Sequence, residues 1–168
     1  MVAVSRRTIK KSDSNTYEKE RGKPMPSLDH SLTQARLVYV LMRDFENKFT
    51  FSSELSLDII PKGATPDICV YPKMERVIGQ QADTIKMKEA PITTIEILSP
   101  SQALDDVIDK IRSQYFPNGV QSAWVVIPSM RAIALAVPGQ KAYTFFTKGK
   151  LTDPATGISV DVDEVFKV

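Results

Sequence analysis

Apolar residues recur at intervals of three and four along two segments of the chain, residues 27–45 and residues 101–117. This spacing places them on one face of a helix, as in amphipathic helices. The expected buried stripe of the first helix comprises Leu28, Leu32, Ala35, Tyr39, Met42 and Phe45. That of the second comprises Leu104, Val107, Ile108, Ile111 and Tyr115. The pattern therefore predicts two helices that each bury one face.

Residues suited to helix ends flank both segments. Ser27 or Asp29 can cap the first helix, because a short oxygen-bearing side chain accepts a hydrogen bond from the first turn. The second helix is expected to start within SPSQ, residues 99–102, with the serine as cap and the proline as first helical residue. Gly119 lies just beyond its expected end.

Six segments have the pattern of β-strands. Residues 49–60 alternate apolar and polar side chains, and residues 66–71 are expected to run back beside them after a Pro-Gly turn. Residues 92–98 are almost all β-branched or apolar, as expected of a central strand covered on both faces. Three more strands are predicted at residues 122–128, 131–137 and 141–147, the last two as a hairpin around PGQ.

The order of these elements predicts a mixed α/β fold: helix, three strands, helix, strand, and then an added hairpin. A helix connects the strands at 92–98 and 122–128, so these two should be parallel. The strands at 49–60 and 66–71 should form an antiparallel hairpin. Residues 153–166 are expected to add a short strand and a turn of helix.

Composition narrows the class of protein. A chain of 168 residues with 42% hydrophobic residues can bury one ordinary core, so we expect a single domain over residues 17–168. Residues 1–16 are polar and basic, which predicts a flexible arm that is either a solvated tail or a contact for phosphate groups. The chain lacks a long apolar run and a signal-peptide pattern, so we expect a cytoplasmic protein with no membrane partner. Its net charge of +2 does not diagnose a nucleic-acid partner.

One carboxylate stands out in this pattern. Glu96 interrupts the otherwise apolar stretch at residues 92–98, and an isolated buried carboxylate costs several kcal/mol unless a cation compensates it. The best companion is Asp67, at the start of the strand after the Pro-Gly turn. Two carboxylates at neighbouring strand ends would form a hard oxygen site suited to Mg²⁺ or Mn²⁺.

These residues also carry a resemblance to a known family. The PD of residues 66–67 and IEILSPS of residues 95–101, preceded by YEKERGKPMPSLDH and followed by DDVIDK, resemble the Uma2 family of predicted endonucleases. This family belongs to the PD-(D/E)xK nuclease superfamily, and the resemblance spans roughly residues 17 to 166. It implies a restriction-endonuclease-like core and a metal held by Asp67, Glu96 and the backbone carbonyl of Ile97.

The superfamily's usual catalytic lysine position holds Leu98 in this sequence. The resemblance implies that Lys110, on the following helix, takes this role. The spacing from Lys110 to Tyr115 is one residue longer than in the family pattern. The alternative is a solvent-facing Lys110 that pairs with Asp106 one helical turn away.

Four further residues are weaker candidates for supporting roles. The resemblance points to Glu18 and His30, with Glu20 as a neighbouring substitute for Glu18. Glu54 lies on the polar face of its strand and could approach Asp67. Exposed acids would explain the three glutamates, and a structural role would explain the lone histidine.

The resemblance implies a Mg²⁺-dependent or Mn²⁺-dependent endonuclease that hydrolyses the phosphodiester bonds of DNA. Cutting both strands of a duplex would favour a homodimer. Two alternatives stay open: a nucleic-acid-binding module that does not cut, and a structural domain whose carboxylates are satisfied by internal Arg or Lys partners. We expect Cys69 and Trp124 to be packing residues.

Overall fold

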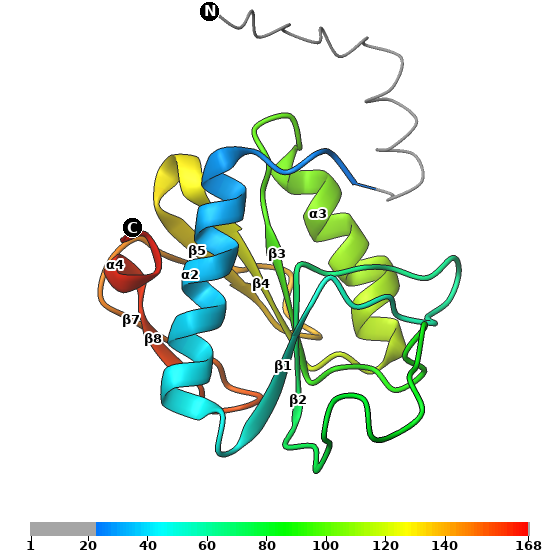
Figure 1. Ribbon diagram of the computed structural model, residues 1–168. Coiled ribbons are helices and arrows are strands. Elements are labelled where there is room, and N and C mark those ends of the chain that lie inside the picture. The colour runs from blue at the N-terminus through cyan, green and yellow to red at the C-terminus, as the bar shows by residue number, and fades with distance from the viewer. Residues whose placement is uncertain (1–22, 168) are drawn as a thin grey trace, which may run out of the picture.

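The computed structural model describes residues 23–167 of the chain. A six-stranded sheet lies between helix α2 (Leu28–Phe45) on one face and helix α3 (Leu104–Lys110) on the other (Figure 1). The strands are β1 (Phe49–Ser53), β2 (Ile68–Pro72), β3 (Thr93–Ile97), β4 (Ser122–Ile127), β5 (Ala132–Ala136) and β6 (Thr144–Phe146). The expected arm at residues 1–16 lies outside the described residues.

Strand pairing follows the predicted topology. The strands lie in the order β1-β2-β3-β4-β5-β6, and β3 and β4 are parallel, as expected of strands joined through a helix. The other pairs, including the β1–β2 and β5–β6 hairpins, are antiparallel. The predicted mixed α/β fold is therefore confirmed.

Side chains of the central strands alternate between two hydrophobic cores, one on each face of the sheet. On β2, Ile68 and Val70 face α2, whereas Cys69 and Tyr71 face α3. All residues of β3 and β4 are buried, as predicted for central strands. The α2 side also contains the indole of Trp124, so the prediction of a core role for this residue is confirmed.

The C-terminal part of the chain covers the α2 side of the sheet. It consists of β7 (Lys150–Thr152), β8 (Ser159–Asp161) and the short helix α4 (Val162–Val165). Asp153, fully buried between β7 and β8, accepts hydrogen bonds at Oδ2 from the side chains of Thr93, Ser122 and Trp124. One carboxylate thus fastens this segment to β3 and β4.

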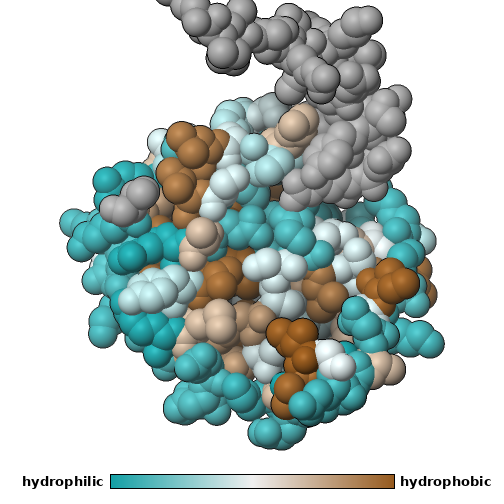
Figure 2. Space-filling view, in the orientation of Figure 1, coloured by the Kyte–Doolittle hydropathy of each residue, from teal (hydrophilic) through white to brown (hydrophobic). Residues whose placement is uncertain are grey.

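The predicted buried stripe of α2 is wrong. The buried residues of this helix are His30, Thr33, Leu37, Val40 and Leu41. Most of the predicted stripe is exposed on the other side, with Leu28 73% and Tyr39 53% exposed. Apolar residues lie on both sides of this helix, so spacing alone could not identify the buried side. The face of the molecule that carries α2 accordingly shows separate hydrophobic patches between hydrophilic ones (Figure 2).

Two predicted boundaries are also wrong, while the cap at Ser27 is confirmed. Strand β1 stops at Ser53 because Glu54 adopts a left-handed backbone with φ of 55°. Helix α3 begins only at Leu104, because residues 99–102 form a turn in which the Gln102 N–H donates to the Ser99 carbonyl at 3.0 Å.

The second helix changes its winding after α3. A π-helical turn, η1 (Ile111–Tyr115), and a 3-10 turn, η2 (Phe116–Asn118), continue it to Gly119. Gly119 has φ of 100°, a conformation that favours glycine at the end of a helix, as its position in the sequence predicts.

Candidate active site

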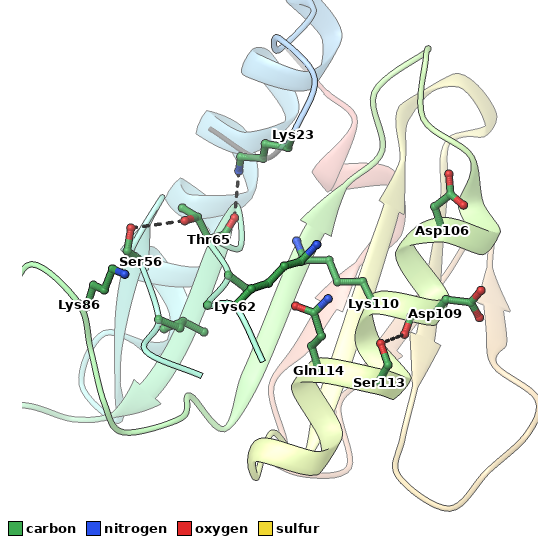
Figure 3. Close-up of a pocket in the computed structure, with 13 residues that line it drawn as sticks. Lys23, Ser56, Lys62, Thr65, Lys86, Asp106, Asp109, Lys110, Ser113 and Gln114 are labelled. Carbon is green, nitrogen blue, oxygen red and sulfur yellow. Dashed lines mark hydrogen bonds between the residues drawn. The ribbon is translucent and has the colours of Figure 1, made fainter. Parts of the chain in front are cut away.

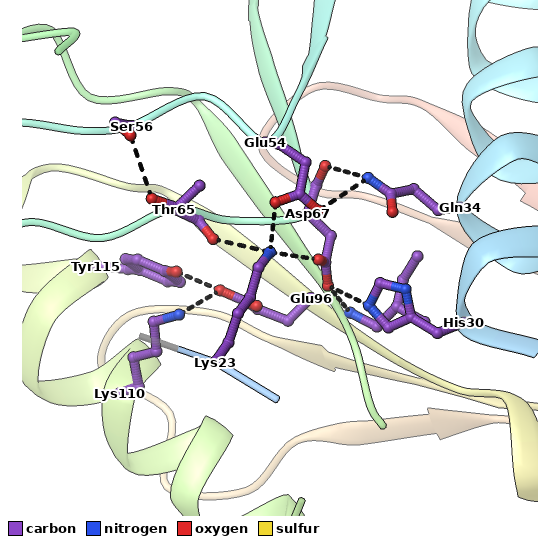
Figure 4. A network of polar contacts seen from close by, with 11 residues as sticks. Lys23, His30, Gln34, Glu54, Ser56, Thr65, Asp67, Glu96, Lys110 and Tyr115 are labelled. Atoms are coloured by element: carbon purple, nitrogen blue, oxygen red, sulfur yellow. Dashed lines mark hydrogen bonds and ion pairs between the residues drawn. The ribbon is translucent and has the colours of Figure 1, made fainter. Parts of the chain in front are cut away.

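Asp67 lies directly before β2, beside Glu96 of β3. Ile68 pairs with Ile95 at the end of the antiparallel register, and the backbone N–H of Ile97 donates to the Asp67 carboxylate. Both carboxylates are buried, and Figure 4 shows them within one network of polar contacts. The structure therefore brings together the two acids that the sequence singles out.

Three donors surround the carboxylate of Asp67. The backbone N–H of Ile97 donates to Oδ2 at 2.6 Å, and Nε2 of His30 lies 3.2 Å from the same oxygen. The ammonium of Lys23 lies 2.6 Å from Oδ1. Burial opposes ionisation, but the hydrogen bond from His30 and the charge of Lys23 together lower the pKa of Asp67 to about 2. Asp67 is therefore an anion at neutral pH despite its burial.

His30 lies in the first turn of α2 and is almost completely buried. With Nε2 on Asp67, its Nδ1 atom has no hydrogen-bond partner among the described residues. The histidine thus helps to fix the orientation of the Asp67 carboxylate.

Glu96 accepts two side-chain hydrogen bonds from the second helix. Lys110 Nζ lies 2.8 Å from Oε1, and the Tyr115 hydroxyl donates to the same oxygen. Burial and the charge of Glu96 raise the pKa of Tyr115 well above its usual value, so the phenol keeps its proton. The alternative in which Lys110 pairs with Asp106 is wrong, because its ion pair is with Glu96.

The π-helical turn explains how Lys110 and Tyr115 reach the same oxygen. A π-helical turn takes in one residue more than an α-helical turn. Residues five apart are therefore brought to one side of the helix, and Lys110 Nζ lies 5.2 Å from the centroid of the Tyr115 ring. The extra residue between them is absorbed by η1.

Leu98 occupies the position where the superfamily usually has lysine. Its side chain is half-buried and packs against the hydrophobic core on the α3 side, while its backbone N–H donates to Val126. The positive charge next to Glu96 comes instead from Lys110, on the helix.

Lys23 is a residue of the site that the sequence patterns did not reveal. Its ammonium lies 3.0 Å from Oε2 of Glu54 and 3.2 Å from the carbonyl oxygen of Thr65, in addition to its contact with Asp67 (Figure 4). Glu54 thus does approach Asp67, as its strand position suggested. Gln34 of α2 joins the same network, donating to the Asp67 carbonyl at 3.0 Å.

The oxygen atoms around Lys23 are chemically suited to a divalent cation. Two carboxylates and a backbone carbonyl converge on one positive charge, and hard cations such as Mg²⁺ prefer oxygen ligands. Within residues 23–167, no three His, Cys, Asp or Glu side chains already form a metal-binding group. The oxygen atoms fit Mg²⁺ or Mn²⁺ in chemical kind, but in this arrangement they surround the ammonium of Lys23.

A hollow of about 750 Å³ opens beside these carboxylates. Lysines contribute much of its lining: Lys23, Lys62, Lys86 and Lys110 (Figure 3). Asp106 and Asp109 lie on the α3 side of the hollow. Because Lys23 and Lys110 also touch the carboxylates, the hollow adjoins the network around Asp67 and Glu96.

The remaining candidates divide into two groups. Glu18 and Glu20 lie outside the described residues, so their positions stay predictions. Cys69 is fully buried, as expected of a packing residue, and burial raises the pKa of its thiol to about 12.

Among the helices in the described part of the chain, none is both long and apolar enough to cross a membrane.

Comparisons with known proteins give the family and support the fold. The profile of the Uma2 family, described as "Putative restriction endonuclease", matches residues 19–157. A similar solved structure is the crystal structure of a "putative nuclease belonging to DUF820" from Anabaena variabilis, with 24% identity and a TM-score of 0.71. The match covers 85% of this chain and 83% of that one, and supports the fold. A comparison with curated proteins finds no match. Since the profile covers most of the chain, the protein belongs to the Uma2 family.

Proposed function

We propose that this protein is a divalent-metal-dependent endonuclease that hydrolyses the phosphodiester bonds of DNA. The observation that carries the proposal is the placement of Asp67 beside Glu96, with the ammonium of Lys110 on Glu96. Two buried carboxylates at neighbouring strand ends, with a lysine from a helix beside one of them, suit metal-assisted phosphoryl chemistry.

Each residue of the site has a definite task in this proposal. Asp67, Glu96 and the carbonyl of Ile97 would hold Mg²⁺ or Mn²⁺, which supplies Lewis-acid polarisation and lowers the pKa of a bound water. Lys110 supplies positive charge to the phosphate as negative charge develops in the transition state. His30 keeps the carboxylate of Asp67 in position.

Tyr115 performs the corresponding positioning task for Glu96. Its phenol keeps its proton because burial and Glu96 raise its pKa, so it remains a hydrogen-bond donor to the carboxylate. Glu96 is thus oriented from the helix, while Asp67 is oriented from α2 and from the backbone of β3.

The lysine-lined hollow supports a polyanionic substrate. Lys62 and Lys86 line it, beside the two lysines that touch the carboxylates. The net charge of the chain is only +2, so this concentration of lysines is local rather than a general property of the surface. Phosphate groups on both sides of a scissile bond would meet positive charge here.

A second candidate function is nucleic-acid binding without cleavage. Two observations favour it: Leu98 replaces the usual lysine, and Lys23 already neutralises Asp67. The two functions differ in whether a metal ion and hydrolysis are needed.

Conversion of supercoiled plasmid to nicked and linear forms tests the proposal. Wild type should cut in Mg²⁺ or Mn²⁺ and stop in a chelator, while Asp67→Asn and Glu96→Gln should lose activity. Lys148→Met is the control, because this exposed lysine lies outside the site. Plasmid binding without metal-dependent cutting would favour the second function, and equal cutting by Glu96→Gln would refute the assignment of the site.

A further inference from the structure

We propose that Lys23 is a built-in competitor of the divalent cation for the carboxylate of Asp67. The inference deepens the proposed function and rests on it, because it concerns the regulation of the same site. It is carried by the contacts of Lys23, by its burial and by the chain segment that delivers it.

The contacts place the ammonium on one of the proposed metal ligands, the carboxylate of Asp67. Lys23 Nζ lies 2.6 Å from Oδ1 of Asp67, 3.0 Å from Oε2 of Glu54 and 3.2 Å from the Thr65 carbonyl oxygen. A Mg²⁺ ion bound to the same Asp67 oxygen would lie about 2.1 Å from it. Two cations cannot share that oxygen at such distances without strong repulsion. The ammonium on Asp67 therefore opposes the binding of a metal ion at the same oxygen.

Burial strengthens the attraction between Lys23 and Asp67. The Lys23 side chain is 9% exposed and that of Asp67 only 2% exposed, so water screens their attraction poorly. Exposed ion pairs contribute little to stability, whereas breaking a buried pair leaves an uncompensated charge. A metal ion that displaces Lys23 must break this buried ion pair, and this cost lowers the apparent affinity of the site for the metal ion.

The segment between Lys23 and α2 is short and restricted. Pro24 and Pro26 each fix one backbone angle, and Ser27 caps α2 by accepting a hydrogen bond from the His30 N–H at 3.2 Å. Lys23 is thereby held close to the end of the helix that also supplies His30 to Asp67. The chain thus brings Lys23 and His30 to the same carboxylate.

Calorimetric titration of Mn²⁺ into the full chain tests the competition. Lys23→Met keeps the length of the side chain and removes the charge, and should bind Mn²⁺ about tenfold more tightly than wild type. Lys62→Met is the matched control, because Lys62 lines the same hollow but makes no ion pair among residues 23–167. It should change the affinity by no more than about twofold. Equal affinities of the two variants would overturn the proposal.

A second measurement uses wild type alone and so does not depend on the folding of a variant. Acylation of lysines, quantified by mass spectrometry, should modify Lys23 slowly without metal and faster as Mn²⁺ saturates the site. Exposed Lys148 is the internal reference and should not change. If Mn²⁺ binds but the labelling of Lys23 stays unchanged, Lys23 does not compete with the metal ion, while the proposed metal site still stands. Failure of both wild type and Lys23→Met to bind Mn²⁺ would overturn the metal site as well.

Discussion

Lys110 Nζ lies 2.8 Å from Oε1 of Glu96, although the two residues belong to different elements, α3 and β3. The helix thus supplies a positive charge beside the carboxylate of a strand, whereas Leu98, directly after that strand, carries no charge. The arrangement separates two tasks, since Glu96 would hold the metal ion and Lys110 would meet the phosphate.

This separation predicts how Lys110→Met behaves. Removal of the ammonium should lower the rate of plasmid cutting by about 100-fold or more, as loss of a single charge-stabilising group does elsewhere. Mn²⁺ affinity should not fall, because the variant relieves Glu96 of a competing cation. Single-turnover cutting measures the first effect and calorimetry measures the second. If Lys110→Met also loses Mn²⁺ binding, the two residues do not have separate roles.

The π-helical turn predicts that one deletion is tolerated. Removing Ser113, which is exposed within η1, should convert the π turn to an α-helical turn and keep both Lys110 and Tyr115 on Glu96. We expect the free energy of unfolding in urea to change by no more than about 1 kcal/mol.

Deletion of Asp109 is the matched comparison, because it removes a residue from the α-helical part. It would rotate Val107 and Ile108 away from the core and should cost more than about 3 kcal/mol. Equal destabilisation by the two deletions would show that η1 does not absorb an inserted residue.

The buried carboxylate of Asp153 predicts a stability effect remote from the active site. Asp153→Ala would leave the donors of Thr93, Ser122 and Trp124 without their acceptor and should destabilise the fold by about 3 kcal/mol. Urea unfolding followed by Trp124 fluorescence measures the loss.

The exposed Asp163→Asn is the control for Asp153 and should change stability by less than about 0.5 kcal/mol. Mn²⁺ affinity should stay unchanged in both variants, because neither residue contacts the carboxylates of the site. An Asp153→Ala protein as stable as wild type would show that this carboxylate does not fasten the C-terminal segment.

The low pKa of Asp67 predicts a pH dependence of stability. Its folded value of about 2 lies below the usual value of an unfolded carboxyl group, so its charge stabilises the fold above about pH 4. This contribution, about 2 kcal/mol, is lost as the pH falls from about 4 through 2.

Urea unfolding at pH 5 and pH 2.5 measures that loss. The decrease should be smaller in Asp67→Asn than in wild type, because the variant has no proton to take up at this position. Asp44→Asn, at an exposed ion pair with Arg43, should keep most of the decrease. If the free energy of unfolding of Asp67→Asn decreases as much as that of wild type, Asp67 does not carry the assigned charge.

Much of the fold could be predicted because local patterns reflect it directly. The apolar content of residues 92–98 indicated a central strand, and the helix between β3 and β4 indicated parallel pairing. The buried face of α2 could not be predicted, since apolar residues lie on both sides and the sheet selects one. The start of α3 was missed because SPSQ satisfies a turn as well as a helix end.

The candidate site divides in the same way. Glu96 could be found because a charge in an apolar strand needs compensation, and Asp67 because it opens the neighbouring strand. Lys23 could not, because it is one of 22 basic residues and no local pattern indicates its contact with a residue 44 positions away. Tyr115 was predicted as a member of a buried stripe and as a spacing mark after Lys110, and neither pattern shows that its hydroxyl would reach a carboxylate.

The most direct test of the central claim is a crystal structure of the protein grown with Mn²⁺, with anomalous data recorded at the manganese edge. We expect an anomalous peak between the carboxylates of Asp67 and Glu96, with the ammonium of Lys23 moved away from Asp67. An absent peak at saturating Mn²⁺, with Lys23 still on Asp67, would contradict the proposed metal site.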